Sequence, residues 1–105
     1  MTINFTETEI FINDAKCFNY SKKGNDFSIA DNNGKEIIKG VIRKNLRGSF
    51  ESVIMFLNVG KTFTNKKVIG RNDLIFSLIN YKVIGPGCQF NIEKLNKFIE
   101  ENNGL

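Results

Sequence analysis

FSIADNNGKEII, residues 27–38, points to an antiparallel sheet. Two short runs rich in β-branched and aromatic side chains, 27–30 and 36–38, flank Asn33-Gly34. An Asn-Gly pair between such runs is a strong hairpin signal, because a type I′ turn requires positive φ at both central residues. We therefore predict two antiparallel strands that meet at a tight Asn33-Gly34 turn.

Residues 35–47 also permit a helix, which competes with the second strand. On a helical wheel the apolar side chains fall on one side and the basic side chains on the other. The apolar set is Ile37, Ile38, Val41, Ile42 and Leu46, and the basic set is Lys35, Lys39, Arg43 and Arg47. Gly40 inside such a helix would cost ~1 kcal/mol, and β-branched residues prefer a strand. We favour the strand and keep the helix as the alternative.

The residues before the hairpin have the pattern of further strands. Runs at 10–13 and 16–20 end at Asn13-Asp14 and at residues 22–25, where polar residues and glycine favour turns. Short strands joined by turns in this way predict a meander.

Segment 49–60 is ambiguous. Its apolar residues have the helical spacing i, i+3, i+4, i+7 and are Phe50, Val53, Ile54 and Leu57. Ser49 could cap such a helix and Gly60 could end it. Because Val, Ile and Phe dominate the segment, it could equally be a buried strand. We predict the helix and keep the strand as the alternative.

Two further helices are predicted in the last third of the chain. The first runs from Leu74 to Lys82 with Gly70 or Asn72 as its cap, and its largely apolar circumference places it centrally. Gly85-Pro86-Gly87 then breaks the chain. The second begins after Asn91 as the N-cap, ends at residues 103–104 and carries one apolar stripe. That stripe consists of Ile92, Leu95, Phe98 and Ile99.

Strands followed by helices predict one α+β domain over residues 1–105. We expect an antiparallel β-sheet packed against two or three C-terminal helices. The ten phenylalanines supply apolar side chains for its core. Because the N-terminus has no leader-like pattern, we expect a cytoplasmic protein. Cys17 and Cys88 could pair, but we expect them to be reduced and buried.

The chain contains no histidine, which excludes several classes of enzyme. Neither a Ser-His or Cys-His pair nor an HExxH zinc site can form. Gly60-Lys61-Thr62 matches the end of a Walker A loop, but Met55 stands where that loop needs its first glycine. A calcium loop aligned on Gly34 would begin at Ile29, where a carboxylate is required. Cys88 has no base to activate its thiol. We therefore expect no catalytic residue, no metal site and no cofactor.

Positive charge is concentrated in the middle of the chain. Residues 35–82 contain ten basic and three acidic side chains, a net charge of +7, whereas the whole chain carries +4 with a pI near 9.2. Such segregation favours attraction to an acidic partner. The predicted partner-binding residues are Lys39, Arg43, Arg47, Lys61, Lys66, Lys67 and Arg71.

Two functions fit this description. The first is a non-enzymatic, stoichiometric protein-binding module, such as an inhibitor or a toxin-neutralising immunity or antitoxin-like protein, with arginines as interface anchors. The second is a small basic nucleic-acid-binding domain. This function is less favoured, because the chain has only three arginines and the predicted 73–81 helix is too apolar to be an exposed recognition helix. The longest apolar run, 53–57, is too short to cross a membrane. The richness in Asn, Lys and Ile suggests AT-rich coding DNA and hence a bacterial or phage gene.

Overall fold

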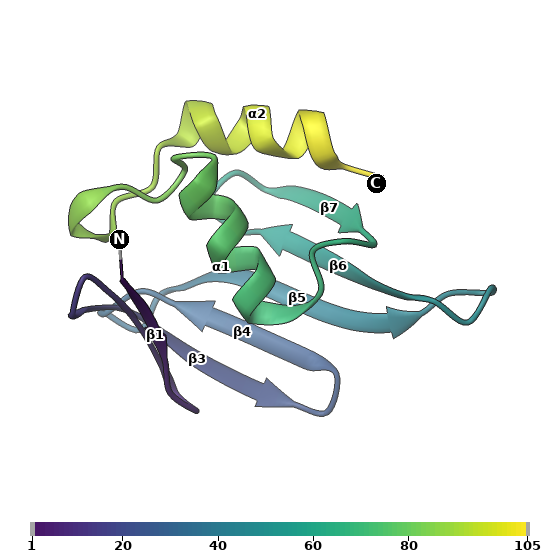
Figure 1. Cartoon of the computed structure of the whole chain (residues 1–105), viewed down its shortest axis with the longest axis horizontal. Coiled ribbons are helices and arrows are strands. Elements are labelled where there is room, and N and C mark those ends of the chain that lie inside the picture. The colour runs from purple at the N-terminus through teal and green to yellow at the C-terminus, as the bar shows by residue number, and fades with distance from the viewer. Residues whose placement is uncertain (1, 105) are drawn as a thin grey trace.

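A computed structural model describes residues 2–104 as a seven-stranded antiparallel sheet with two α-helices on one of its faces (Figure 1). Each strand pairs with the next, so the sheet order is the chain order. The strands are β1 (Ile3–Phe5), β2 (Glu9–Ile12), β3 (Ala15–Lys23), β4 (Asp26–Ala30), β5 (Glu36–Lys44), β6 (Phe50–Phe56) and β7 (Lys61–Asn65). The helices are α1 (Gly70–Asn80) and α2 (Ile92–Asn102), with the 3₁₀ turn η1 (Pro86–Cys88) between them. The α+β class with an antiparallel sheet is thus confirmed.

Strand β5 resolves the choice between strand and helix for residues 35–47. It pairs with β4 on one side and β6 on the other, so its backbone hydrogen bonds run between strands. Gly40, which counted against a helix, has a packing role: a Cβ atom there would lie 2.2 Å from the Phe27 ring. The ring of Phe27 therefore packs directly against the β5 backbone.

The connection between β4 and β5 is not the predicted type I′ turn. Residues 31–35 form a longer loop in which only Gly34 has a positive φ, of 82°. The Asp31 carboxylate accepts hydrogen bonds from the backbone N–H groups of Asn33 and Lys35, both at 2.9 Å. This side chain organises the loop, an effect that the Asn-Gly pair alone did not indicate.

The predicted helix at 49–60 is wrong, because residues 50–56 form strand β6. Ser52, Ile54 and Phe56 are fully buried, and the strand pairs with both β5 and β7. A strand inside a sheet carries apolar residues on both faces. The resulting run of apolar residues also matched the i, i+3, i+4, i+7 spacing of a helix. Two strands, β1 and β7, were not predicted.

Helices α1 and α2 complete the core on one face of the sheet. Their buried residues are Leu74, Ile75 and Leu78 in α1 and Leu95, Phe98 and Ile99 in α2. The Phe98 ring stacks on Phe63 of β7, with ring centroids 5.3 Å apart. No helix within residues 2–104 combines the length and apolar character that a membrane span requires.

The helix caps were predicted with mixed success. The Asn91 side chain accepts a hydrogen bond from the Lys94 backbone N–H at 3.0 Å, as predicted. The N-cap of α1 is Ile69 rather than Gly70 or Asn72. Its own N–H donates to the Asp73 carboxylate at 3.2 Å, which resembles the reciprocal half of a capping box without the N-cap side chain.

Cys17 and Cys88 form a disulfide, which corrects the expectation of reduced thiols. Their Cα atoms lie 5.2 Å apart, within the usual range for a disulfide, although 71 positions separate them in sequence. The bond links β3 to η1. Only the folded chain brings the two residues together, so their separation in sequence gave no signal.

Candidate protein-binding surface

The β5–β6 hairpin projects beyond the rest of the sheet (Figure 1). Its loop, residues 45–49, is held by Asn45, whose side-chain oxygen accepts from the N–H groups of Arg47 at 2.9 Å and Ser49 at 3.1 Å. Asn45 also donates its backbone N–H to the Ser49 carbonyl at 2.7 Å. This hydrogen-bonded loop presents Leu46, whose relative exposure of 108% makes it the most exposed large hydrophobic side chain described.

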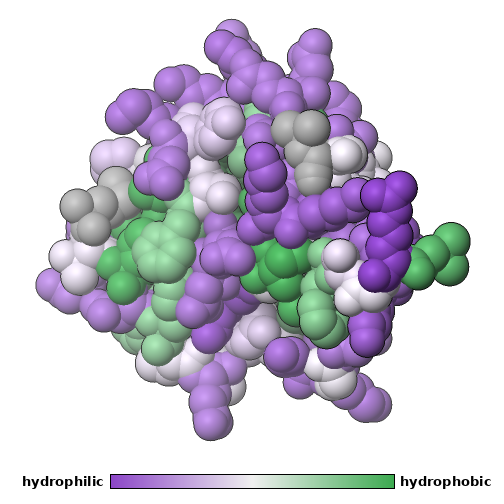
Figure 2. Space-filling view, turned by 45° about the vertical axis from the view of Figure 1, so that its right-hand side comes forward, coloured by the Kyte–Doolittle hydropathy of each residue, from purple (hydrophilic) through white to green (hydrophobic). Residues whose placement is uncertain are grey.

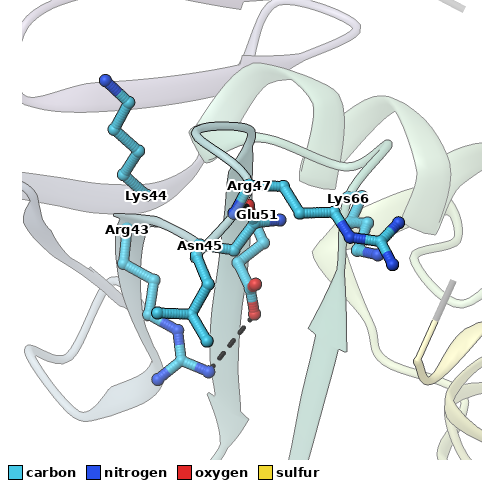
Figure 3. A pocket seen from close by; sticks show the side chains of 7 residues that line it. Arg43, Lys44, Asn45, Arg47, Glu51 and Lys66 are labelled. Atoms are coloured by element: carbon cyan, nitrogen blue, oxygen red, sulfur yellow. Dashed lines mark hydrogen bonds and ion pairs between the residues drawn. The ribbon is translucent and has the colours of Figure 1, made fainter.

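A shallow groove of about 570 Å³ lies beside the loop (Figure 3). We call it the hairpin groove, and its lining is Arg43, Lys44, Asn45, Leu46, Arg47, Glu51 and Lys66. Figure 3 shows the Arg47 side chain extending toward Lys66, which comes from the turn after β7. Arg43 is ion-paired with the buried Glu51 at 3.2 Å. Lys44, Arg47 and Lys66 carry no such partner in the described chain, so the groove has excess positive charge.

Three of the seven predicted partner-binding residues, Arg43, Arg47 and Lys66, therefore lie in one groove. Lys67 follows Lys66 and is exposed. Lys39 lies apart from the groove, on the sheet face opposite the helices, where it forms a 3.4 Å ion pair with Glu36. Lys39 is therefore separate from the groove, although the sequence analysis grouped it with the groove residues.

The other two predicted residues make contacts within the fold. The Lys61 ammonium donates to Asn96 Oδ1 on α2 at 2.8 Å. The Arg71 guanidinium donates to the Thr6 carbonyl at 2.6 Å. It also lies 4.0 Å from the centroid of the Tyr20 ring and 4.8 Å from that of Phe5. Arg71 thus ties α1 to β1 and β3, so the basic stretch does not form one surface.

Sequence reasoning missed three residues of this region: Lys44, Leu46 and Phe50. Leu46 had a place only in the alternative helix over residues 35–47, and Phe50 belonged to the predicted helix at 49–60. Leu46 is exposed within the hairpin loop, and Phe50, which directly follows the loop, is exposed as well. A leucine inside the polar turn sequence Asn45-Leu46-Arg47-Gly48 is the signal that could have revealed the loop.

Two ionisable groups have shifted pKa values, Glu36 and Tyr20. The Ser28 hydroxyl donates to Glu36, and this hydrogen bond, followed by the effect of Lys39, lowers the pKa of that carboxyl. Burial raises the pKa of Tyr20, with Arg71 acting in the opposite direction. A carboxyl with a lowered pKa is a poorer base. Within residues 2–104, no group of three or more His, Cys, Asp or Glu side chains is placed to hold a metal ion.

Comparison with known proteins gives no relative: no family model, curated protein or solved structure matches the chain.

Figure 2 shows the surface with the hairpin side of Figure 1 turned toward the viewer. Hydrophilic side chains cover most of it and surround small apolar areas. A few exposed apolar side chains within a charged rim are typical of a protein-binding surface.

Proposed function

We propose that the protein is a non-enzymatic, stoichiometric binding module that recognises an acidic surface on a partner protein through the hairpin groove and Leu46. The observation that carries the proposal is the projecting loop, which presents the fully exposed Leu46 together with Arg47 beside Lys44 of β5 and Lys66 of the turn after β7. A protruding apolar side chain can enter a pocket on a partner, while the surrounding cations steer association. Inhibitors and toxin-neutralising immunity or antitoxin-like proteins work in this way, by occluding a surface.

The arrangement favours protein over nucleic acid as the partner. Arg43 is neutralised by Glu51, and Arg71 is held between aromatic rings, so two of the three arginines are engaged within the fold. Arginine is the residue that most often reads bases and stacks on them. The fully exposed Leu46 beside these cations suits an apolar pocket better than a phosphate backbone.

Affinity capture from native lysate, with and without nuclease, tests the proposal. We expect the wild-type protein to retain one partner protein at near-stoichiometric yield after nuclease treatment. The Leu46→Ser/Arg47→Glu variant should lose it. A Lys94→Glu/Lys97→Glu variant serves as the control, since it places its charge changes on exposed positions of α2. Capture that disappears with nuclease would replace the proposal with nucleic-acid binding.

The disulfide bears on where the protein acts. Disulfides persist in oxidising compartments and are rare in the cytosol. We therefore propose an oxidising compartment in place of the expected cytoplasm. Alkylation of the protein taken directly from its native cells, followed by mass spectrometry, should show no modified thiol, whereas two modified thiols would support the cytoplasm.

A further inference from the structure

The face of the sheet opposite the helices has a charge pattern unlike the rest of the molecule. We call it the open face. Side chains alternate along each strand, and the buried Ile38, Ile54 and Phe56 point toward the helices. Their neighbours in β5 and β6 therefore point to the open face.

The open face carries as many acidic as basic side chains. Strand alternation and register place eight charged side chains on this face: Glu9, Lys16, Lys23, Asp26, Glu36, Lys39, Arg43 and Glu51. All three ion pairs found among residues 2–104 lie here: Lys16 with Glu9 at 3.3 Å, Lys39 with Glu36 at 3.4 Å and Arg43 with Glu51 at 3.2 Å. Lys23 and Asp26 stand opposite each other in the β3–β4 register. This face is therefore neutral, and the net charge of +4 belongs to the rest of the chain.

An apolar stripe runs through the middle of this neutral face. Val41 and Val53 are cross-strand partners, and Met55 follows Val53 by two residues on the same side of β6. Val41 and Met55 are exposed large hydrophobic residues, and Leu57, in the turn after β6, is exposed as well. Such a stripe, exposed and bordered by paired charges, is typical of an interaction surface.

We propose that the open face binds a second copy of this chain, sheet against sheet. Two copies that meet through the hairpin groove bring like charges together, whereas two open faces meet without net repulsion. An acidic partner would be attracted to the hairpin groove and gains no charge attraction from a neutral face. The self-association therefore goes beyond the proposed function and centres on Val41 and Met55, while Arg43 and Glu51 lie where the open face meets the hairpin groove.

The size of the face is adequate for a dimer. Five strands, β3 to β7, spaced about 4.8 Å apart and about seven residues long, form a face of about 24 by 24 Å. Because accessible area exceeds projected area, this approaches the ~800 Å² per partner of a standard interface. Apolar side chains of two such sheets interdigitate at about 10 Å separation.

Light scattering after size-exclusion chromatography, together with sedimentation velocity, tests this proposal on the purified chain. The wild type should be a dimer at about 100 μM, in the range expected for a modest interface. Met55→Lys should raise the dissociation constant at least tenfold, because it places two unpaired charges in the stripe. Val41→Lys provides a second, independent variant should the first fail to fold.

Ile92→Lys is the matched control, since Ile92 on α2 is 43% exposed and Met55 is 44% exposed. It should leave the dimer intact, and so should Arg47→Glu in the hairpin groove. A monomeric wild type at that concentration overturns the proposal and leaves the face to a different protein. Equal weakening by Met55→Lys and Ile92→Lys also overturns it, because association would then not depend on the open face. Either result leaves the hairpin groove proposal intact.

Discussion

Two regions of the molecule each contain an arginine beside apolar side chains, but one region holds the fold together and the other is exposed to solvent. Around β3, Arg71 lies against Tyr20 and Phe5, and a disulfide joins Cys17 to Cys88. At the β5–β6 hairpin, Arg47 and Leu46 stand exposed on a loop held by its own Asn45. The first region, which we call the β3 anchor, joins distant parts of the chain, whereas the hairpin joins only adjacent strands. Stability and recognition are therefore expected to separate on mutation.

Reduction of the disulfide should give the largest effect. A link across 71 positions stabilises the folded chain by about 4 kcal/mol in the chain-entropy description. We expect a large drop in melting temperature in the presence of a phosphine reductant, measured by circular dichroism. The Cys17→Ala/Cys88→Ala variant should melt at the same lowered temperature with or without reductant. An unchanged wild-type melting temperature would show that β3 and η1 hold together without the bond.

Charge reversal in the hairpin groove should give the next effect, on binding and not on folding. Arg47→Glu/Lys66→Glu should weaken the partner complex on the order of a hundredfold, or about 2.7 kcal/mol. The association rate of the wild type should fall as salt rises. Calorimetry and stopped-flow kinetics measure the two quantities. A shift of the variant's melting temperature comparable to that of a β3 anchor variant would remove the distinction between the regions.

Substitution of the two arginines sharpens the comparison directly. Arg71→Ala removes contacts with two aromatic rings and a hydrogen bond to Thr6, and should lower the free energy of unfolding by about 1–2 kcal/mol. Arg47→Ala should change it by less than about 0.5 kcal/mol. Urea unfolding measures both. Arg71→Lys should recover only part of the loss, because an ammonium does not stack as a guanidinium does.

The Ser28–Glu36 contact should add a small pH dependence of stability. The hydrogen bond from Ser28 and the ion pair with Lys39 lower the pKa of Glu36 below 4.5. The stabilisation is therefore present above pH 4.5 and is lost as the pH falls through the lower, folded-state pKa. The difference in melting temperature between the wild type and Glu36→Gln should shrink between pH 6 and pH 3. A constant difference would show that the carboxyl charge contributes nothing.

The smallest expected effect is that of pH on partner binding. The chain has no histidine, so the charge of the hairpin groove should not change between pH 5 and 8. The dissociation constant of the complex should therefore vary with salt far more than with pH in this window. Titrations with buffers of equal ionic strength measure this, and a steep change would implicate a group on the partner.

The elements that sequence analysis identified correctly were those whose signals are local. Asn91 capped α2 as expected, since a cap acts within one turn. Residues 36–44 formed a strand, in keeping with their β-branched content. Residues 50–56 were assigned to a helix because apolar residues on both faces of a buried strand can mimic a helical stripe. Strand β7 was not predicted, because its burial depends on α2 and β6 together.

The candidate site was predicted in part. Arg43, Arg47 and Lys66 meet in one groove, while Arg71 and Lys61 are held by partners far away in sequence. Composition could not show this, because strand register and helix docking determine which charges are paired. Leu46 had a place only in the alternative helix over residues 35–47, whereas the structure exposes it in the hairpin loop.

The sequence by itself determined the antiparallel α+β class, the positive charge of the middle segment and the absence of histidine chemistry. These properties follow from composition and from the spacing of apolar residues at intervals of two to four positions. Tertiary structure alone decided which arginines are free, that Cys17 meets Cys88, and that the ion pairs gather on the open face. Such pairings join residues on separate strands and helices, so they exist only once register and packing are fixed.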